Sequence, residues 1–308
     1  MKEITVYAPA TVANLNCGFD VLGLAIDGPG DTITLRKVKK RGITITKIEG
    51  AELPMEATKN VAGVAGIAML DYLKADFGFE IDIVKGIPIG SGIGGSAASA
   101  AAMVYGINQF LAEPLSTQQL AFFGMKGEAL ASGNEHADNV APALFGGITL
   151  IPGYHPFEVI ELPVPPQLYV TVVHPHIEIN TKAAREILPK QVRLKDAIVQ
   201  AGNLAGLVAG FYSQNFQLIA SSLKDVLIEP HRKQLLPYFD AAKTTALEQG
   251  ALGFGISGSG PSMFALSEGK NTAEKLRTQL VELYSRQNVE IDSFASPINA
   301  EGAKIISV

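Results

Sequence analysis

The sequence has little of several features that would otherwise suggest a function. Its 308 residues include a single cysteine, Cys17, and no tryptophan. One cysteine cannot form an intramolecular disulfide, which favours a reducing compartment. Apolar runs stay shorter than the roughly 18 residues that would suggest a membrane span. The first residues also lack the apolar stretch of a signal peptide. We therefore expect a cytoplasmic protein with no membrane partner.

Excess positive charge is also missing. Lys and Arg total 25 against 30 Asp and Glu, which gives a net charge of −5. Proteins that bind nucleic acid usually show the opposite balance, so we expect no nucleic-acid partner.

The chain does have the composition of a folded protein, with 47% hydrophobic and 18% charged residues. Its length predicts two domains. Pro163, Pro165 and Pro166 interrupt any regular element, and they place the boundary near residues 155–167. We therefore expect domains at residues 1–160 and 161–308.

Hydrophobic periodicity predicts a mixture of strands and helices, and so an α+β fold. Strands are expected at residues 3–8, 31–38, 42–48, 79–84, 146–151, 168–173, 251–256, 262–266, 290–296 and 303–307. Helices are expected at residues 59–77, 96–111, 117–131, 181–188, 193–212, 215–223, 231–248 and 271–287.

Glycine is the abundant feature, and five of the ten residues 86–95 are glycines. This segment joins a predicted strand to a predicted helix that Ser96 opens as its cap. A helix start offers free N–H groups, and glycine lets the backbone approach an anion closely. The alanines at 97, 98 and 100–102 would keep the helix narrow beside a polyphosphate. The segment predicts a phosphate-binding loop; a tight turn packed against a neighbour is the alternative.

The loop also contains Gly90-x-Gly92-x-x-Gly95, with Glu113 about 20 residues on. This matches the dinucleotide-binding fingerprint, which requires a second strand after the helix. Here Pro114 and another predicted helix follow instead. The residues before Ser96 also lack the lysine of a Walker loop. An NAD-dependent oxidoreductase remains the alternative from a different class of enzyme.

Three segments, in order along the chain, resemble the motifs of the GHMP kinases. They are Pro9-Ala-Thr-Val-Ala-Asn-Leu-Asn-Cys-Gly-Phe-Asp20, Pro88-Ile-Gly-Ser-Gly-Ile-Gly-Gly-Ser-Ala-Ala98 and Gly255-Ile-Ser-Gly-Ser-Gly-Pro-Ser262. The segments 136–147, 180–185 and 229–232 resemble those of the homoserine kinase family within this superfamily. Gly95 and Asn16-Cys17 depart from the usual Ser and Gly-Pro of the family motifs.

The resemblance implies a fold and a reaction. It implies an N-terminal α+β domain with a left-handed β-α-β crossover, a ferredoxin-like C-terminal domain, and a homodimer. The reaction would be ATP-dependent phosphorylation of L-homoserine to O-phospho-L-homoserine, a step toward threonine. Another GHMP kinase with a carboxylate-bearing acceptor such as shikimate is the alternative enzyme, and a catalytically silent binding protein on this fold is the third possibility.

The resemblance also implies the nucleotide site. ATP phosphates would lie on the loop, Asn60 would contact adenine, and Mg²⁺ would be held by Ser96 and Glu128, because Mg²⁺ prefers oxygen ligands. The implied ATP-binding residues are Asn60, Pro88, Ile89, Gly90, Ser91, Gly92, Ile93, Gly94, Gly95, Ser96 and Ala97.

The chemistry of homoserine agrees with the residues available. Arg185 and Arg232 suit its carboxylate, because guanidinium groups match carboxylate geometry, and Asp20 suits its ammonium. The hydroxyl would be oriented by Asn14, His136, Asn139 and Thr181, and the resemblance adds Gly260 to the substrate contacts. Asn139, Thr181 and His136 are the candidate catalytic residues. Neither Asn139 nor Thr181 is a good general base, so we expect direct transfer from an oriented hydroxyl.

Each assignment has a structural alternative. Arg185 fits a solvated charge, and Arg232 fits a surface pair with Glu229. Asp20, Asn14 and Asn139 fit turn positions, His136 fits a structural histidine, and Glu128 fits an exposed helix acid. Cys17 is interpreted as a packing residue. His174 and His176 lack a third ligand nearby, so we favour surface or structural roles over a metal site.

Overall fold

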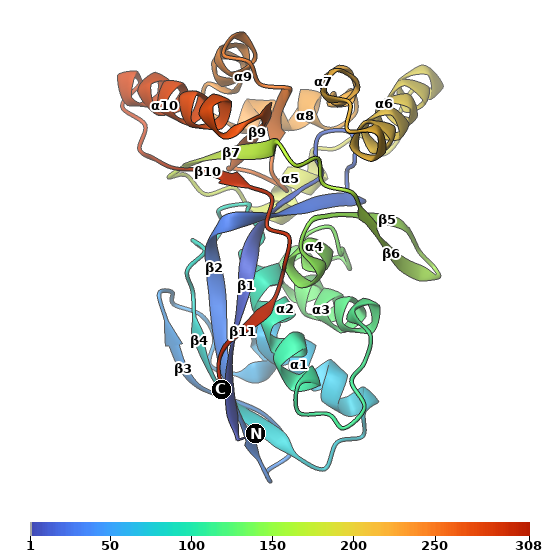
Figure 1. The fold of residues 1–308 in the computed structure, drawn as a ribbon. Helices are drawn as coiled ribbons and strands as arrows, with labels where there is room; N and C mark the ends of the chain where they lie inside the picture. Colours follow the sequence, from blue (N-terminus) through green and yellow to red (C-terminus); the bar gives the residue numbers. More distant parts are fainter. Residues whose placement is uncertain (1) are drawn as a thin grey trace.

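The N-terminal half of the chain forms a mixed sheet, shown in Figure 1. The computed structural model describes residues 2–308, without the side chain of Ser132. In this part of the chain the sheet runs β11-β1-β2-β4-β3, and a hairpin of β5 and β6 extends it from β2. The bounds are β1 Glu3–Ala13, β2 Leu22–Val38, β3 Gly42–Glu49, β4 Gly78–Val84, β5 Ile148–Tyr154, β6 Phe157–Leu162 and β11 Lys304–Ser307. The long strand β2 joins the parts of the sheet, because its start pairs with β5 and its end with β4.

Four helices pack beside this sheet: α1 (Val61–Tyr72), α2 (Gly95–Asn108), α3 (Thr117–Ser132) and α4 (Val140–Phe145). The 3-10 turn η1 (Ala57–Lys59) precedes α1. The alanines at the start of α2 are fully buried, and their small side chains let the helix lie at the centre of the layer. The sequence pattern predicts that a polyphosphate lies against them. That expectation is wrong, because these alanines face the core.

The C-terminal half contains a second sheet with the order β10-β7-β9-β8. Its strands are β7 Leu168–Pro175, β8 Gly253–Ile256, β9 Met263–Glu268 and β10 Ile291–Pro297. Two helices, α9 (Phe239–Glu248) and α10 (Lys270–Arg286), complete a β-α-β-β-α-β arrangement, which is the ferredoxin-like order. The remaining helices of this half are α5 Thr181–Glu186, α6 Leu194–Ser213, α7 Phe216–Ser222, α8 Glu229–Arg232 and the 3-10 turn η2 Lys233–Leu235.

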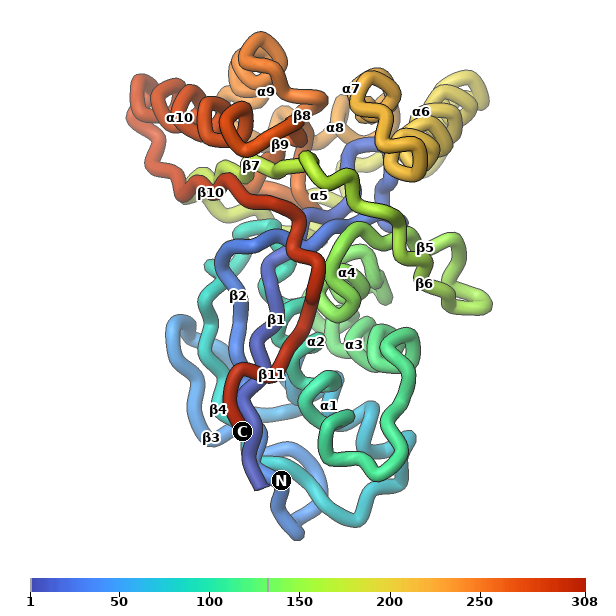
Figure 2. The backbone as a smooth tube through the Cα atoms, in the orientation of Figure 1, coloured from blue at the N-terminus to red at the C-terminus, as the bar shows by residue number. Residues whose placement is uncertain are grey.

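The end of the chain returns to the first sheet. After β10, the chain runs back along the molecule, and β11 pairs antiparallel with β1, so the two termini lie near each other (Figure 2). The last strand therefore belongs to the sheet of the first half. The division into domains at residues 1–160 and 161–308 stays a prediction.

Most expected elements are present, and three differences have local causes. Residues 157–162, expected to lie in the connection, form β6 opposite β5, and the prolines that suggested an interruption follow this strand. The helix expected at 231–248 is split, because Pro237 removes a backbone donor and Tyr238 adopts a positive φ of 56°. The short helix α4 was not expected, and it carries Pro142 in its first turn, where proline is tolerated. No helix of the described residues is long and apolar enough to cross a bilayer.

Candidate active site

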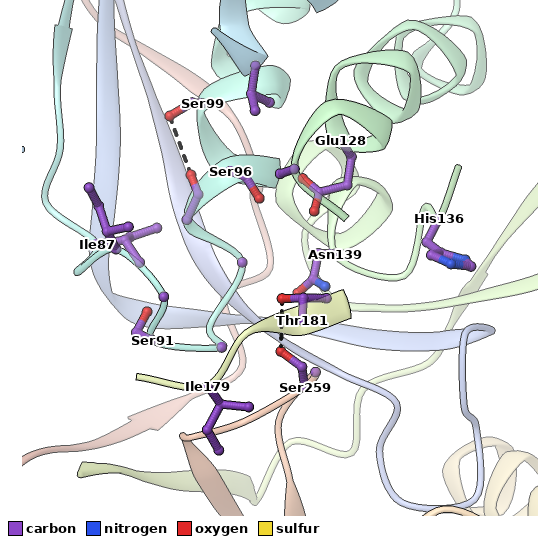
Figure 3. Close-up of a pocket in the computed structure, with 18 of the residues that line it drawn as sticks. Ile87, Ser91, Ser96, Ser99, Glu128, His136, Asn139, Ile179, Thr181 and Ser259 are labelled. Atoms are coloured by element: carbon purple, nitrogen blue, oxygen red, sulfur yellow. Dashed lines mark hydrogen bonds between the residues drawn. The ribbon is translucent and has the colours of Figure 1, made fainter. Parts of the chain in front are cut away.

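A cavity of about 560 Å³ lies between residues of the two halves. The first half contributes the loop after β4 together with residues near 14–20, 53–61 and 128–139. The second half contributes residues 178–182, Arg185, Arg232 and residues 258–259. Figure 3 shows Ser96, Glu128, Asn139 and Thr181 around this space. The volume is in the range of small-molecule and cofactor sites.

The loop between β4 and α2 has the backbone of an anion cradle. Gly90, Gly92 and Gly94 all have positive φ values, between 70° and 79°, which glycine adopts without steric cost. Gly94 is also spatially required, because a Cβ there would lie 2.0 Å from the Thr11 hydroxyl oxygen. Helix α2 begins at Gly95 with Gly94 as its N-cap and without a side-chain cap. The predicted Ser96 cap is therefore wrong, and the free N–H groups of the first turn face the loop.

The Ser96 side chain instead faces Glu128 on α3, and the two form a hydrogen bond. Burial raises the pKa of Glu128 to about 7, and both Ser96 and the positive charge of Lys85 act in the opposite direction. A carboxylate in such a place gains from a nearby cation. A buried carboxylate beside a hydroxyl is an oxygen donor set that suits Mg²⁺ shared with phosphates. The alternative reading of Glu128 as an exposed helix acid is wrong.

A buried ion pair lies beneath the loop. The Lys85 ammonium pairs with Asp31 of β2, and the two side chains are 4% and 0% exposed. Lys85 also donates to the Gly95 carbonyl (2.7 Å) and the Ser99 hydroxyl (2.9 Å). Asp31 accepts from the backbone N–H groups of Gly86 and Ile87, each at 3.2 Å. The network ties the start of the loop and the first turn of α2 to the sheet.

The third motif holds the loop from the other half of the molecule. The Ser257 hydroxyl donates to the Gly92 carbonyl (2.7 Å), and the Ser262 N–H donates to the Ser91 carbonyl (3.1 Å). A Cβ on Gly92 would lie 2.5 Å from the Gly260 carbonyl oxygen. Gly260 is therefore packed against the loop rather than lining the cavity, whereas Gly258 and Ser259 line it.

At the opposite end of the cavity, Asp20 and Arg185 form an ion pair. One guanidinium nitrogen of Arg185 lies 2.7 and 2.9 Å from the two carboxylate oxygens of Asp20. The Asp20 N–H donates to the Asn14 side-chain oxygen (3.1 Å), and the Asn14 amide donates to the Gly258 carbonyl (2.8 Å). Asp20 has a φ of 61°, a conformation in which Asp is several-fold enriched. The structure thus makes Asp20 both a turn residue and a charged wall of the cavity.

Asn14 begins a left-handed stretch, with φ values of 74° at Asn14, 42° at Leu15 and 60° at Asn16. Asparagine tolerates this region better than other non-glycine residues, so Asn16 suits a position where the family has glycine. Its side-chain amide donates to the Leu223 and Phe254 carbonyls at 2.9 and 3.2 Å. This departure from the family motif therefore anchors the first motif to the second half. Cys17 is buried, and burial raises its thiol pKa to about 12, which fits a packing role.

Arg232 is buried at the same end and is only 3% exposed. Its guanidinium donates to the Ala184 carbonyl (3.0 Å) and the Gly258 carbonyl (2.9 Å). Burial lowers its pKa to about 10, and the nearby Arg185 acts in the same direction. The alternative surface pair with Glu229 is wrong, because Glu229 pairs with Lys243. Two cations this close favour an anion between them.

Two rings, those of Phe19 and His136, lie beside the charged residues of the acceptor end. The Arg185 and Arg232 guanidinium carbons lie 5.2 and 5.0 Å from the Phe19 ring centroid, so both cations are within cation–π range of one aromatic ring. The nearer His136 nitrogen is 3.7 Å from an Asp20 carboxylate oxygen. Burial lowers the pKa of His136; Asp20 opposes this effect and Arg185 adds to it.

Asn139 lies where the two ends meet, and Thr11 orients its side chain. The Thr11 hydroxyl donates to the Asn139 Oδ1 at 2.7 Å. Because this oxygen accepts a hydrogen bond, the Nδ2 group is the part of the amide that can reach a ligand, and it is a donor. Thr181, at the start of α5, lies 3.2 Å from the Ser259 hydroxyl. Both residues line the cavity.

The other expected site residues divide into two groups. Asn60 lines the cavity, and its side chain also caps α1 by accepting from the Ala62 N–H (3.1 Å). Pro88, Ile89 and the loop residues up to Ser96 line the cavity as well, apart from Ile93. Ile93 and Ala97 are fully buried in the core, so neither side chain contacts this space.

Three residues that support the site were not expected from the sequence: Lys85, Asp31 and Thr11. Their partners are 10 to 128 residues away in the chain, so local patterns carry no trace of the contacts. A lysine that ends a strand directly before a glycine-rich loop was the available signal. His176 lies 3.1 Å from Asp292, and among the described residues no cluster of three or more His, Cys, Asp or Glu side chains is placed to hold a metal ion. Glu113 is the acidic residue that a dinucleotide-binding fingerprint would need at the end of a second strand. It lies instead in the connection between helices α2 and α3, so the loop is not a dinucleotide-binding fingerprint.

Comparison with known protein families identifies the class. The model for the GHMP kinases N terminal domain matches residues 55–147, and the model for the GHMP kinases C terminal matches residues 207–286. Together they cover more than half of the chain and include the loop and Glu128. The chain is a GHMP kinase.

Individual relatives narrow this class. A homoserine kinase of Chlorobium phaeobacteroides (strain BS1) is 40% identical over 99% of this chain and 100% of its own length. A homoserine kinase of Xanthomonas campestris pv. campestris (strain B100) is 38% identical over 100% and 95%. The crystal structure of a homoserine kinase from Cytophaga hutchinsonii is 47% identical and has a TM-score of 0.95 over 99% of this chain and 98% of that one. The chain belongs to the homoserine kinase family.

Proposed function

We propose that this protein transfers the γ-phosphoryl group of ATP to the side-chain hydroxyl of L-homoserine, giving O-phospho-L-homoserine and ADP. One observation carries the proposal. A cavity has an anion cradle at one end, opposite charges at the other, and the Asn139 amide where the two meet. Such a cavity accepts a triphosphate and an amino-acid alcohol together.

The acceptor end suits both charged groups of homoserine. The substrate carboxylate would lie between Arg185 and Arg232, which lowers the repulsion between these two cations. The ammonium would contact Asp20, which now has Arg185 as its cationic partner. Binding would thus exchange a pair within the protein for two pairs with the substrate. Shikimate has no ammonium, so it would leave Asp20 facing hydroxyl groups, and this disfavours the alternative acceptor.

The transfer step would need orientation more than a base. The homoserine hydroxyl oxygen forms a bond to the γ-phosphorus while the bond from that phosphorus to the β,γ-bridging oxygen breaks. Asn139 and Thr181 are poor bases near pH 7, and Asn139 offers a donor to this space. We propose that the hydroxyl proton leaves late and passes to a phosphate oxygen. Positioning and charge neutralisation account for most of the rate in such reactions.

The residues near the loop suit a magnesium ion. Ser96 and the half-buried Glu128 provide a hydroxyl and a carboxylate on facing helices. Mg²⁺ bound there would neutralise charge on the phosphates. The loop N–H groups and the first turn of α2 would bind the phosphate oxygens, and Asn60 would lie on the adenine side.

A coupled assay of ADP release tests the proposal. We expect turnover with ATP and L-homoserine, and little or none with shikimate, mevalonate or galactose. Turnover with shikimate at a similar kcat/KM would favour the alternative acceptor. No turnover with any acceptor, together with intact ATP binding, would favour a silent binding protein. Omission of Mg²⁺ should abolish the rate.

Finer expectations belong to the same proposal. We propose that the product is used toward threonine, that the protein works in the cytoplasm, and that it forms a homodimer, as the family resemblance implies. Light scattering after size-exclusion chromatography tests the last point, and a monomer mass at micromolar concentration would contradict it.

A further inference from the structure

Tyr154, at the end of β5, lies outside the residues that line the cavity. Its hydroxyl nevertheless joins two of the segments that form the acceptor end. It donates to the backbone carbonyl of Asp20 at 2.8 Å and accepts from the backbone N–H of Ala137 at 3.3 Å. Ala137 lies directly after His136 and two residues before Asn139. One hydroxyl therefore joins the Asp20 turn to the segment that carries the oriented amide.

The ring of Tyr154 is fixed by its neighbours. It stacks on Phe157 with ring centroids 6.1 Å apart at 30°, and it meets the edge of His136 at 6.4 Å and 81°. These two ring contacts restrict the movement of the Tyr154 ring and therefore of its hydroxyl. Its position is therefore set by packing, and the two backbone groups follow it.

Asp20 needs such support because its backbone is in the left-handed region, with a φ of 61°. Both of its backbone polar groups are held by side chains: the N–H by Asn14 and the carbonyl by Tyr154. A residue in this region persists when its surroundings over-determine it. The direction of the Asp20 carboxylate thus depends on the Tyr154 hydroxyl, which bonds the backbone carbonyl of Asp20.

We propose that Tyr154 is a positioning residue for the amino-acid acceptor. It acts through Asp20 by holding the ammonium-binding carboxylate at a fixed distance from the wall that carries His136 and Asn139. This inference rests on the proposed function for the identity of the acceptor. It adds a residue that selects the acceptor without contacting it.

The variant Tyr154→Phe tests this, because it keeps the ring and removes only the hydroxyl. We expect kcat/KM for L-homoserine to fall about 5- to 10-fold, because the variant loses both part-buried hydrogen bonds of the hydroxyl. Most of the change should appear in the KM for homoserine, and the KM for ATP should stay within about twofold. The matched control is Tyr284→Phe, which removes a buried tyrosine-to-carbonyl hydrogen bond of 3.0 Å in the second half. This control should lower the melting temperature and leave both KM values unchanged.

A double-mutant cycle with Asp20→Asn shows whether the effect passes through Asp20. Once the carboxylate is neutral, adding Tyr154→Phe should change kcat/KM by less than about twofold. Full additivity of the two variants would overturn the inference, as would an unchanged homoserine KM in Tyr154→Phe. An equal rise in both KM values would also overturn it, because this would indicate a general loss of structure. A wild-type protein without homoserine turnover would instead overturn the proposed function, so the two failures are distinguishable.

Discussion

The two ends of the cavity are built in different ways. The phosphate end is mostly backbone from one continuous stretch, residues 86–96, fixed from below by the Lys85–Asp31 pair and from the side by Ser257. The acceptor end consists of side chains from separate segments, with Asp20, Arg185 and Arg232 drawn from both halves of the chain. A phosphate cradle can serve many kinases, whereas the charges opposite it decide the acceptor. The rigid end and the selective end should therefore respond differently to mutation.

The largest effect is expected where the rigid end is anchored. Asp31→Asn should lower the free energy of unfolding by about 3–5 kcal/mol, because it leaves the Lys85 ammonium buried without its counter-charge. Chemical denaturation measures this, and ATP affinity should weaken along with stability. The double variant Asp31→Asn with Lys85→Met removes both charges and should recover part of the lost free energy of unfolding.

The control for this variant is Asp196→Asn, which breaks the exposed pair with Arg193 and should cost less than about 1 kcal/mol. A stable Asp31→Asn protein whose KM rises only for homoserine would contradict this prediction. The Lys85–Asp31 pair would then support the acceptor end of the cavity rather than the phosphate end.

The selective end should show the opposite split. Arg232→Ala should lower kcat/KM for homoserine, if the carboxylate is bound by this buried charge. The corresponding loss of transition-state stabilisation should be about 2–5 kcal/mol. The KM for ATP should change little. Steady-state kinetics with each substrate varied in turn measures both values.

Arg232 also holds two backbone carbonyls, so its loss could lower stability. Arg185→Ala provides a second variant, because Arg185 is partly exposed and its guanidinium hydrogen-bonds the Asp20 carboxylate rather than the backbone carbonyls that Arg232 holds. Arg193→Ala, at a highly exposed site, is the neutral control. Similar defects for ATP and homoserine in both Arg185→Ala and Arg232→Ala would argue against the assignment of these residues to the carboxylate.

The two ends also differ in how well the sequence predicted them. The loop was predictable because its glycines, its strand and its helix are consecutive in the chain. Asp20, Arg185 and Arg232 could be proposed because homoserine has charges that require them, but their pairing could not. The Asp20–Arg185 contact spans 165 residues, and nothing local to either residue encodes it.

The predictions that were wrong or missing also concern contacts between distant segments of the chain. The alanines of α2 look like a surface for phosphate, and only the tertiary packing shows that they face the core. Thr11 gave no signal, because its hydroxyl acquires a role only when Asn139 is brought to it. The split of the helix expected at 231–248 was readable from Pro237, since proline cannot donate within a helix. Sequence patterns report periodicity and punctuation, and contacts between distant segments lie outside them.

The variant Ser96→Ala tests whether a side chain at the phosphate end takes part in the transfer step. Ser96→Ala should lower kcat by about 10²-fold or more if this hydroxyl helps hold the charge that is transferred. Pre-steady-state and steady-state rates with ATP and homoserine measure the loss. The control is Ser116→Ala, which removes the N-cap of α3 and should reduce stability by about 1 kcal/mol without changing kcat. An unchanged kcat in Ser96→Ala would limit Ser96 to its hydrogen bond with Glu128.

The smallest effect expected is a change in the pH dependence of stability. The pKa of Glu128 rises from 4.5 to about 7 in the folded protein because of burial. The folded state therefore keeps a proton that the unfolded state loses, so stability falls as the pH rises from about 4.5 to about 7 and then levels off. Glu128→Gln should remove this part of the slope, on the order of 1–3 kcal/mol between pH 5 and pH 8. Denaturation curves of both proteins at several pH values, without nucleotide, measure the difference.

Asp138 makes the comparison with Glu128→Gln necessary, because burial raises the pKa of Asp138 to about 8 and gives a slope of the same sign. Only the difference between wild type and Glu128→Gln isolates Glu128. Addition of Mg²⁺ and ATP should stabilise the wild type more at pH 8 than at pH 5, since the cation favours the ionised carboxylate. Glu128→Gln should lose most of that pH dependence. If its stabilisation by Mg²⁺ and ATP matched the wild type at both pH values, Glu128 would not be a magnesium ligand.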